Sequence, residues 1–294
     1  EEGSGKSYEA SGTTITFSAA VASGDSCYLV YMGSAQQTVT APAGSIVSGQ
    51  FSSADLSLTG NLGIGITPDS ISNGNALQVN RSVINDDDGG STHITQNAYY
   101  DSAWKYVENG TAEKITFATG ATTFSNATSN SSGADASLTW VDNMVIDANG
   151  QVTKPLQPAF SVTDSGPQSN FATQSTVDIT FGTEVFDVNG DFASSVFTAP
   201  VTGKYVLCAN ITFSNMDQDA DFTSVTIDTS NRNYSNIIDP EGFDKDLSYF
   251  SFTITVVADM DASDTAKVTF YQSAGAAVAD LATGQTYFSG YLLG

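Results

Sequence analysis

The sequence predicts an all-β protein in which small N-terminal β modules precede a C-terminal jelly-roll β-sandwich. Its composition is rich in Ser, Thr, Ala, Gly and Asn, with 17 Phe and 12 Tyr, and such a composition favours strands and turns. No long stretch has the i, i+3, i+4, i+7 apolar spacing of an amphipathic helix. Short apolar runs between turn residues fill the chain instead, and they are densest in its second half.

The length of 294 residues favours about two domains, and the pattern divides the chain further. Residues 1–55 predict a small β module, beginning with a polar tether at 1–7. So small a module has a meagre core, and we expect it to lean on neighbours or on copies of itself. Residues 56–155 predict a Gly-rich, hairpin-containing shaft, and residues 156–294 a jelly-roll head. The chain begins at Glu1 without Met or a signal peptide, so we expect it to be a trimmed part of something longer.

The stretch Leu56–Pro68, LSLTGNLGIGITP, combines apolar residues with closely spaced glycines. Glycine at this density allows close approach of neighbouring backbones. A phosphate-binding G-x-G loop is the rival interpretation, but it needs a third glycine and a following helix, and Pro68 in a β-rich context argues against both. Further on, NMVIDANGQVTKP (143–155) has the strand, D-A-N-G turn and strand pattern of a hairpin. The low-complexity segment 126–137 predicts a loop.

The second half contains the strongest strand signals. The rigid A-P-V-T-G corner at Ala199–Gly203 separates two apolar runs, because Pro200 suits a strand end and Gly203 permits the turn. Eight or more strands with turns between them suit a jelly roll. The predicted strands lie near 158–163, 176–182, 192–198, 203–214, 222–229, 247–258, 265–273 and 284–293.

The formal net charge is −23, from 32 Asp and Glu against 9 Lys and Arg. Such a surface repels nucleic acid and anionic membranes. No apolar run reaches 18 residues, so we expect no membrane insertion. Cys27 and Cys208 fall in different predicted domains, each within an apolar strand, and we expect buried free thiols.

The sequence contains no strong arrangement of catalytic residues, and we predict that the protein is not an enzyme. His93 is the single histidine, and its polar, turn-rich surroundings predict a surface imidazole without a nucleophile elbow. A zinc site lacks ligands. A glycan hydrolase needs only two well-placed carboxylates, so it stays a remote alternative.

Calcium is the one cofactor that the sequence suggests. Asp217, Asp219 and Asp221 stand at alternate positions, like the first ligands of an EF-hand loop, but Phe222 occupies the position of the required glycine. The segment Asp187–Asp191 fails likewise and predicts an Asn-Gly hairpin turn. Other acidic loops lie at 239–246 and 259–264. Solvated loop ends are the simpler explanation for all of them.

The aromatic residues of the second half are best explained as core or subunit contacts. Tyr99, Tyr100, Trp104 and Tyr106 are harder to place. Packing within a shaft and stacking against sugars are both open for them.

The F-T-A-P-V-x-G-x-Y pattern at 197–205 resembles the complement-1q-like head, a ten-stranded jelly roll of the tumour-necrosis-factor-like superfamily. PAFSV (158–162), VDITF (177–181) and TYFSGYLL (286–293) are similar to other strands of that family. The segment VNGDF (188–192) is shorter than the family's usual N-x-x-x-x-Y. The resemblance implies a homotrimer, with calcium near its apex as a hypothesis.

The elements NLGIGITP…ALQV and NMVIDANGQVTKP resemble motifs of bacteriophage tail fibres. Together with the head, they imply a viral structural protein: a trimeric fibre or appendage of the virion, whose head recognises a glycan or protein on the host surface. Other virion proteins would be its partners, and no receptor-contact residue is assigned. The alternative is a cellular or secreted bacterial adhesin or lectin-like protein of the same fold.

Overall fold

The computed structural model describes residues 8–11, 14–20, 22–24, 26, 60–72, 74–87 and 89–294. The chain divides into two compact units, Glu1–Ser57 and Leu58–Gly294. In the first unit, β1 (Tyr8–Ser11) and β2 (Thr14–Phe17) form an antiparallel pair. The predicted strand CYLVYM (27–32), and Cys27 with it, lies outside the described residues.

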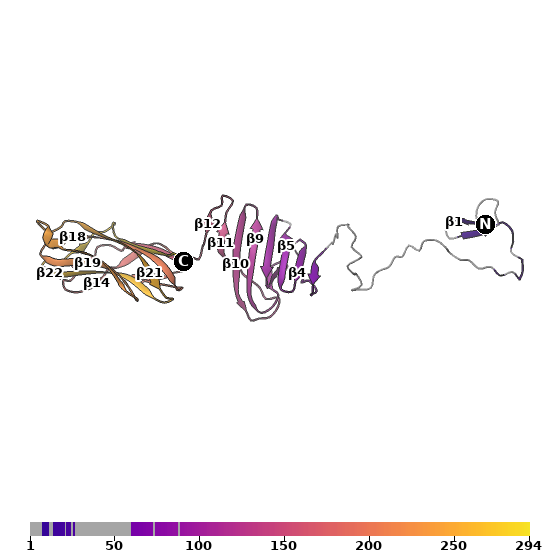
Figure 1. Cartoon of the computed structure of the whole chain (residues 1–294), viewed down its shortest axis with the longest axis horizontal. Coiled ribbons are helices and arrows are strands. Elements are labelled where there is room, and N and C mark those ends of the chain that lie inside the picture. Colours follow the sequence, from indigo (N-terminus) through magenta and orange to yellow (C-terminus); the bar gives the residue numbers. More distant parts are fainter. Residues whose placement is uncertain are drawn as a thin grey trace. The chain divides into compact units, whose positions relative to one another are not determined.

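The second unit begins with an eight-stranded sheet in the order β12-β11-β10-β9-β6-β5-β4-β3 (Figure 1). All neighbours are antiparallel except β3 and β4, which run parallel. The Gly-rich element and the D-A-N-G hairpin therefore form its two opposite edges. The strands are β3 (Leu62–Ile64), β4 (Ala76–Val79), β5 (Ser82–Asp87), β6 (Ser91–Gln96), β9 (Gly110–Ala118), β10 (Ala121–Asn130), β11 (Val141–Ile146) and β12 (Val152–Thr153).

Local chemistry explains both edges. A Cβ on Gly63 would stand 2.1 Å from the carbonyl oxygen of Ile66, so only glycine allows this close approach. At the other edge, one carboxylate oxygen of Asp147 accepts from the backbone N–H groups of Asn149 (2.8 Å) and Gln151 (2.9 Å), and Gly150 has φ 78°. The hairpin predicted from D-A-N-G is confirmed by the pairing of β11 with β12.

A short hairpin covers one face of this sheet. It consists of β7 (Ala98–Tyr100) and β8 (Trp104–Tyr106), and the segment after β10 adds Leu138 and Trp140 to the same cover. Tyr106 donates from its hydroxyl to the backbone carbonyl of Thr128. The predicted loop at 126–137 is wrong in its first part, because β10 continues to Asn130 and is held by pairing with β9.

The remainder of the second unit is a β-sandwich of two sheets, in the orders β15-β13-β24-β18-β21 and β16-β17-β22-β19-β20. Short strands β23 and β14 pair with β18 and β22. This arrangement is the predicted jelly roll. The strands are β13 (Ala159–Asp164), β14 (Val177–Asp178), β15 (Phe181–Asp187), β16 (Phe192–Ala193), β17 (Val196–Thr198), β18 (Gly203–Ser214), β19 (Ala220–Thr229), β20 (Asn233–Ile238), β21 (Phe250–Met260), β22 (Thr265–Ala274), β23 (Asp280–Leu281) and β24 (Tyr287–Leu292).

Aromatic rings fill the space between the two sheets. Phe160 stacks on Phe197 at a centroid distance of 4.7 Å and meets Phe288 edge-on at 5.0 Å. The predicted corner forms between β17 and β18, and the Tyr205 hydroxyl secures it by donating to the carbonyl of Val201 at 2.7 Å. The prediction of a core position is confirmed for Phe197, Tyr205 and Phe288, whose rings are fully buried, whereas Tyr287 of the same predicted set is 38 % exposed.

The sandwich departs from the sequence prediction in several strands. The strand predicted at 176–182 is broken into β14 and β15, which belong to different sheets. Asn189 and Gly190 have φ of 72° and 74°, as an Asn-Gly turn requires, but the predicted hairpin is wrong because β15 and β16 do not pair. Strands β20 and β23 were not predicted. No helix among the described residues has the length and apolar character needed to cross a bilayer.

Candidate functional site

An apolar row crosses the uncovered face of the eight-stranded sheet. Ile84 on β5 lies opposite Ile94 on β6, which lies opposite Ile115 on β9. Ile84 and Ile94 are 45 % and 40 % exposed. We call this line of paired side chains the apolar row; its members, one from each of seven neighbouring strands, are Leu62, Leu77, Ile84, Ile94, Ile115, Phe124 and Met144.

The flanks of the apolar row mix apolar, polar and acidic side chains, the acidic ones being Asp86 and Glu113. A hollow of 590 Å³ opens beside Ile94 and Phe124, and Gln96, Glu113 and Asn126 also contribute to its lining. A hollow bounded by both apolar and amide side chains suits inserted protein side chains. The next pairs along the same face are Ile64 with Val79 on one side and Phe117 with Thr122 on the other.

The covered face carries a compact aromatic cluster. The rings of Trp104 and Trp140 meet at 5.5 Å, and the Lys114 ammonium lies 4.8 Å and 4.7 Å from their centroids. Such contacts stabilise a cation on an aromatic face. Burial lowers the pKa of Lys114, and the Asp142 carboxylate partly opposes that shift. Tyr99 is 4 % exposed and donates to Asp135, so its ring is packed inside the protein and not open at the surface.

His93 does not lie at the surface as predicted; it lies in β6 and is 8 % exposed. Its Nδ1 is 3.0 Å from the Thr116 hydroxyl, and its Nε2 is 3.3 Å from an Asp87 carboxylate oxygen. Burial lowers the pKa of His93 against the opposing effect of Asp87, so the ring is neutral near pH 7. Thr116 pairs with β6 on one side and β10 on the other. The backbone N–H groups around Thr116 are therefore used in pairing between strands, and they are not free to form an oxyanion hole beside its hydroxyl.

The outer face of the sandwich sheet that contains β15, β13, β24, β18 and β21 has an uncharged central part, which is bordered by the facing pair Lys204 and Asp259. One line of paired side chains across it consists of Tyr291, Val206 and Val257, of which Tyr291 and Val257 are 48 % and 56 % exposed. The adjacent lines add serine, threonine, tyrosine and asparagine side chains. This sandwich face comprises Ala159, Ser161, Thr163, Val206, Cys208, Asn210, Thr253, Thr255, Val257, Tyr287, Ser289 and Tyr291.

Cys208 belongs to this sandwich face and not to the core, which corrects the prediction of a buried thiol. It is a free cysteine of intermediate exposure. The Thr255 hydroxyl donates to its sulfur at 3.3 Å. The error arose because the apolar run around Cys208 alternates between core and outer face, and the sequence alone does not show which side each residue takes.

The three calcium candidates, Asp217, Asp219 and Asp221, make different contacts in the structure. Asp217 is 3 % exposed, and its carboxylate accepts from the backbone N–H groups of Ala276 (2.6 Å), Ala277 (2.7 Å) and Asp219 (2.9 Å). Asp221 instead accepts from the Ser273 hydroxyl at 3.2 Å. In the part of the chain that the structure describes, no three Asp, Glu, His or Cys side chains gather as a metal site would require. Calcium binding stays a prediction that this geometry does not support.

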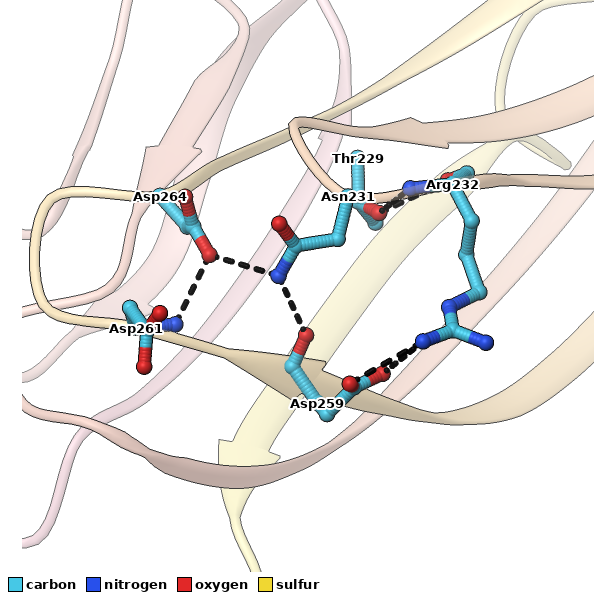
Figure 2. Close-up of polar contacts among 6 residues, drawn as sticks. All are labelled: Thr229, Asn231, Arg232, Asp259, Asp261 and Asp264. Atoms are coloured by element: carbon cyan, nitrogen blue, oxygen red, sulfur yellow. Dashed lines mark hydrogen bonds and ion pairs between the residues drawn. The ribbon is translucent and has the colours of Figure 1, made fainter.

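The acidic residues of the loop at 259–264 form hydrogen bonds and an ion pair with other residues of the same chain. Figure 2 shows the Asn231 side chain donating to the Asp264 carboxylate (2.7 Å) and to the Asp259 carbonyl (3.0 Å). The Arg232 guanidinium lies 2.9 Å from the Asp259 carboxylate. The Asp261 backbone N–H also donates to Asp264, at 2.7 Å. These carboxylates join the β19–β20 turn to the β21–β22 turn and serve the fold of the sandwich.

No family model matches this chain, and no curated protein matches its sequence. Solved structures similar to it include the globular domain of zebrafish complement 1qA protein, which is 18% identical, covers 47% of this chain and 98% of that chain, and has a TM-score of 0.36. Murine APRIL is 13% identical over 47% of this chain and 99% of that chain, with a TM-score of 0.36. The jelly-roll assignment rests on the strand pairing described above.

The apolar row was not predicted from the sequence. Its signal was present as the alternation of apolar and polar residues in segments such as KITF (114–117). Alternation shows that a strand has two unlike faces, but only the register across strands shows that the apolar residues of many strands form one line.

Proposed function

We propose that this chain is a subunit of a homotrimeric bacteriophage fibre or related virion appendage, whose jelly-roll head adheres to the host surface. The apolar row is the observation that carries this proposal. Contiguous apolar surface is rare on monomers, and it marks an interface. The row crosses seven of the eight strands of the sheet, so a partner that covers it must also be extended along the same direction.

Further copies of this chain are the partner that fits best. The chain carries a net charge of −23, and copies repel one another wherever acidic residues face each other. The apolar row contains no charged residue, and neither does the sandwich face. Both faces are identical in every copy, so association around a symmetry axis buries several of them at once.

The virion placement is supported by the two elements that resemble phage fibre motifs. They form the opposite edges of the eight-stranded sheet, at β3–β4 and β11–β12. In this proposal the protein is extracellular as part of the particle, contacts other virion proteins, and binds a host glycan or protein without catalysing a reaction. Three heads per fibre multiply weak contacts, which raises avidity by about 10²–10⁴.

Native mass spectrometry of the full chain tests the association. We expect a mass near three times 30.6 kDa. Ile94→Glu places a carboxylate in the middle of the apolar row and should shift the population to monomer. Ser132→Glu, at an exposed loop position, adds the same charge and should leave the trimer intact. A monomeric wild-type chain at micromolar concentration, or an Ile94→Glu variant as oligomeric as Ser132→Glu, would refute the proposal.

A further inference from the structure

A cavity of 220 Å³ lies on the covered face of the eight-stranded sheet, next to the β7–β8 hairpin. Asn85 and Asp87 reach it from β5, and His93 reaches it from β6 as the register partner of Asn85. Tyr100 and Trp104, a facing pair in the hairpin, line its other side. The cavity is thus formed by one chain, on the face of the sheet opposite to the apolar row.

Asn85 is the unusual member of this lining. It is 2 % exposed, yet neither its amide nitrogen nor its amide oxygen has a hydrogen-bond partner. A buried polar group without a partner is costly, and native proteins satisfy nearly all of them. An occupant of the cavity that both donates and accepts hydrogen bonds would remove this cost.

Asp87 and His93, two other polar residues of the lining, already have partners. One Asp87 oxygen accepts from the backbone N–H groups of Ser91 (2.8 Å) and Gly89 (3.1 Å), and the other faces His93. The nearby ammonium of Lys114 rests on the tryptophan rings. The described lining therefore offers an anion no unpaired cation, and it offers a cation only a carboxylate that is already hydrogen-bonded.

We propose that this cavity binds one neutral sugar residue. Adjacent hydroxyls of a sugar each donate and accept, so two of them match the amide oxygen and amide nitrogen of Asn85. Sugar rings also have apolar faces that pack on aromatic side chains, which Tyr100 and Trp104 provide. A volume of 220 Å³ holds a monosaccharide and not an oligosaccharide. This sugar site lies on the covered face of the eight-stranded sheet, and binding there does not require copies of the chain to associate.

Tryptophan fluorescence can report binding at this site. The sequence has two tryptophans, and both belong to the cluster beside the cavity, where they meet at 5.5 Å. We would titrate the full chain with glucose, galactose, mannose and N-acetylglucosamine while recording tryptophan emission. A ligand of this size in a small cavity should bind with a Kd in the millimolar range. No change in emission with any of the four sugars up to about 100 mM would overturn the proposal.

Asn85→Leu separates binding from folding. Because the amide has no protein partner, replacing it with an apolar group of similar size should leave the thermal stability equal or higher. The same variant should weaken sugar binding at least about tenfold, since the two hydrogen bonds are lost. Asn149→Leu, at an exposed amide in the β11–β12 turn, is the matched control and should bind as the wild type does. Undiminished binding by Asn85→Leu would also overturn the proposal.

Discussion

Replacing Asp217 by asparagine should destabilise the sandwich strongly, although it changes one atom. The buried carboxylate accepts three backbone N–H groups, from Ala276, Ala277 and Asp219. An asparagine can turn its oxygen toward Ala276 and Ala277, but its amide nitrogen then faces the N–H of Asp219. One backbone donor loses its acceptor, which costs about 1–3 kcal/mol, and two charge-assisted bonds become neutral ones, which costs about 1 kcal/mol each.

The sum is a loss of about 3–5 kcal/mol, or a fall in Tm of roughly 10–15 °C for a domain of this size. Differential scanning calorimetry of the full chain measures the fall, and hydrogen-exchange mass spectrometry assigns it to peptides around Asp217 and Ala276. Asp219→Asn is the matched control, because Asp219 is exposed and only its backbone N–H takes part. A Tm for Asp217→Asn within about 1 °C of wild type would contradict this reasoning.

The same contacts set a pH dependence. Burial raises the pKa of Asp217, but the backbone N–H donors outweigh it and hold the net pKa below the ordinary value. A lowered folded pKa gives stability that is present above the unfolded pKa near 3.9 and is lost as pH falls through the folded pKa. The difference in Tm between wild type and Asp217→Asn should therefore shrink below about pH 4. A chelator added at pH 7 tests calcium in the same scan: a lower Tm would support the calcium prediction, and an unchanged one would end it.

Two further variants test other parts of the molecule. Gly290→Ala should lower the Tm of the sandwich, because its Cβ would stand 2.7 Å from Leu207 and 3.1 Å from a backbone oxygen, and such overpacking costs about 1–3 kcal/mol; equal Tm values by calorimetry would contradict this. Burial lowers the pKa of Lys114 in the folded protein. Between that lowered pKa and the ordinary value near 10.4, the unfolded chain binds more protons than the folded one, so the stability of the wild type should rise with pH. Lys114→Gln should abolish this rise. Urea unfolding followed by tryptophan emission at pH 8 and pH 10 measures this, and a variant that keeps the wild-type rise would show that Lys114 is not its cause.

The all-β class and the jelly-roll head could be predicted from the sequence because their signals are local. The Pro200 and Gly203 corner and the alternation in β18 and β21 need no knowledge of distant residues. The break between β14 and β15 could not be predicted, since it depends on each half pairing with a different sheet. Likewise, β20 is held by its pairing with β19.

The apolar row and the cavity beside Asn85 were harder to predict because they depend on register. Ile84, Ile94 and Ile115 are separated along the chain, and only antiparallel pairing makes them neighbours. His93 was assigned to the surface because its sequence neighbours are polar, whereas the β7–β8 hairpin buries it from above the sheet. Asn85 gave no signal, because an asparagine in a polar stretch is normally exposed.

Strand β24 inserts between β13 and β18, and it is synthesised after every other strand of the sandwich. Until the ribosome has added it, β13 and β18 have no common neighbour, and Phe288 is missing from the centre of the core. A nascent chain therefore cannot complete the head while translation is still passing through β22. Pairing between strands so distant in sequence is slow to form, which leaves the upstream eight-stranded sheet time to fold first. The sandwich face is built partly from Tyr287, Ser289 and Tyr291 of this same strand, so an unfinished chain lacks part of this face until β24 has been added.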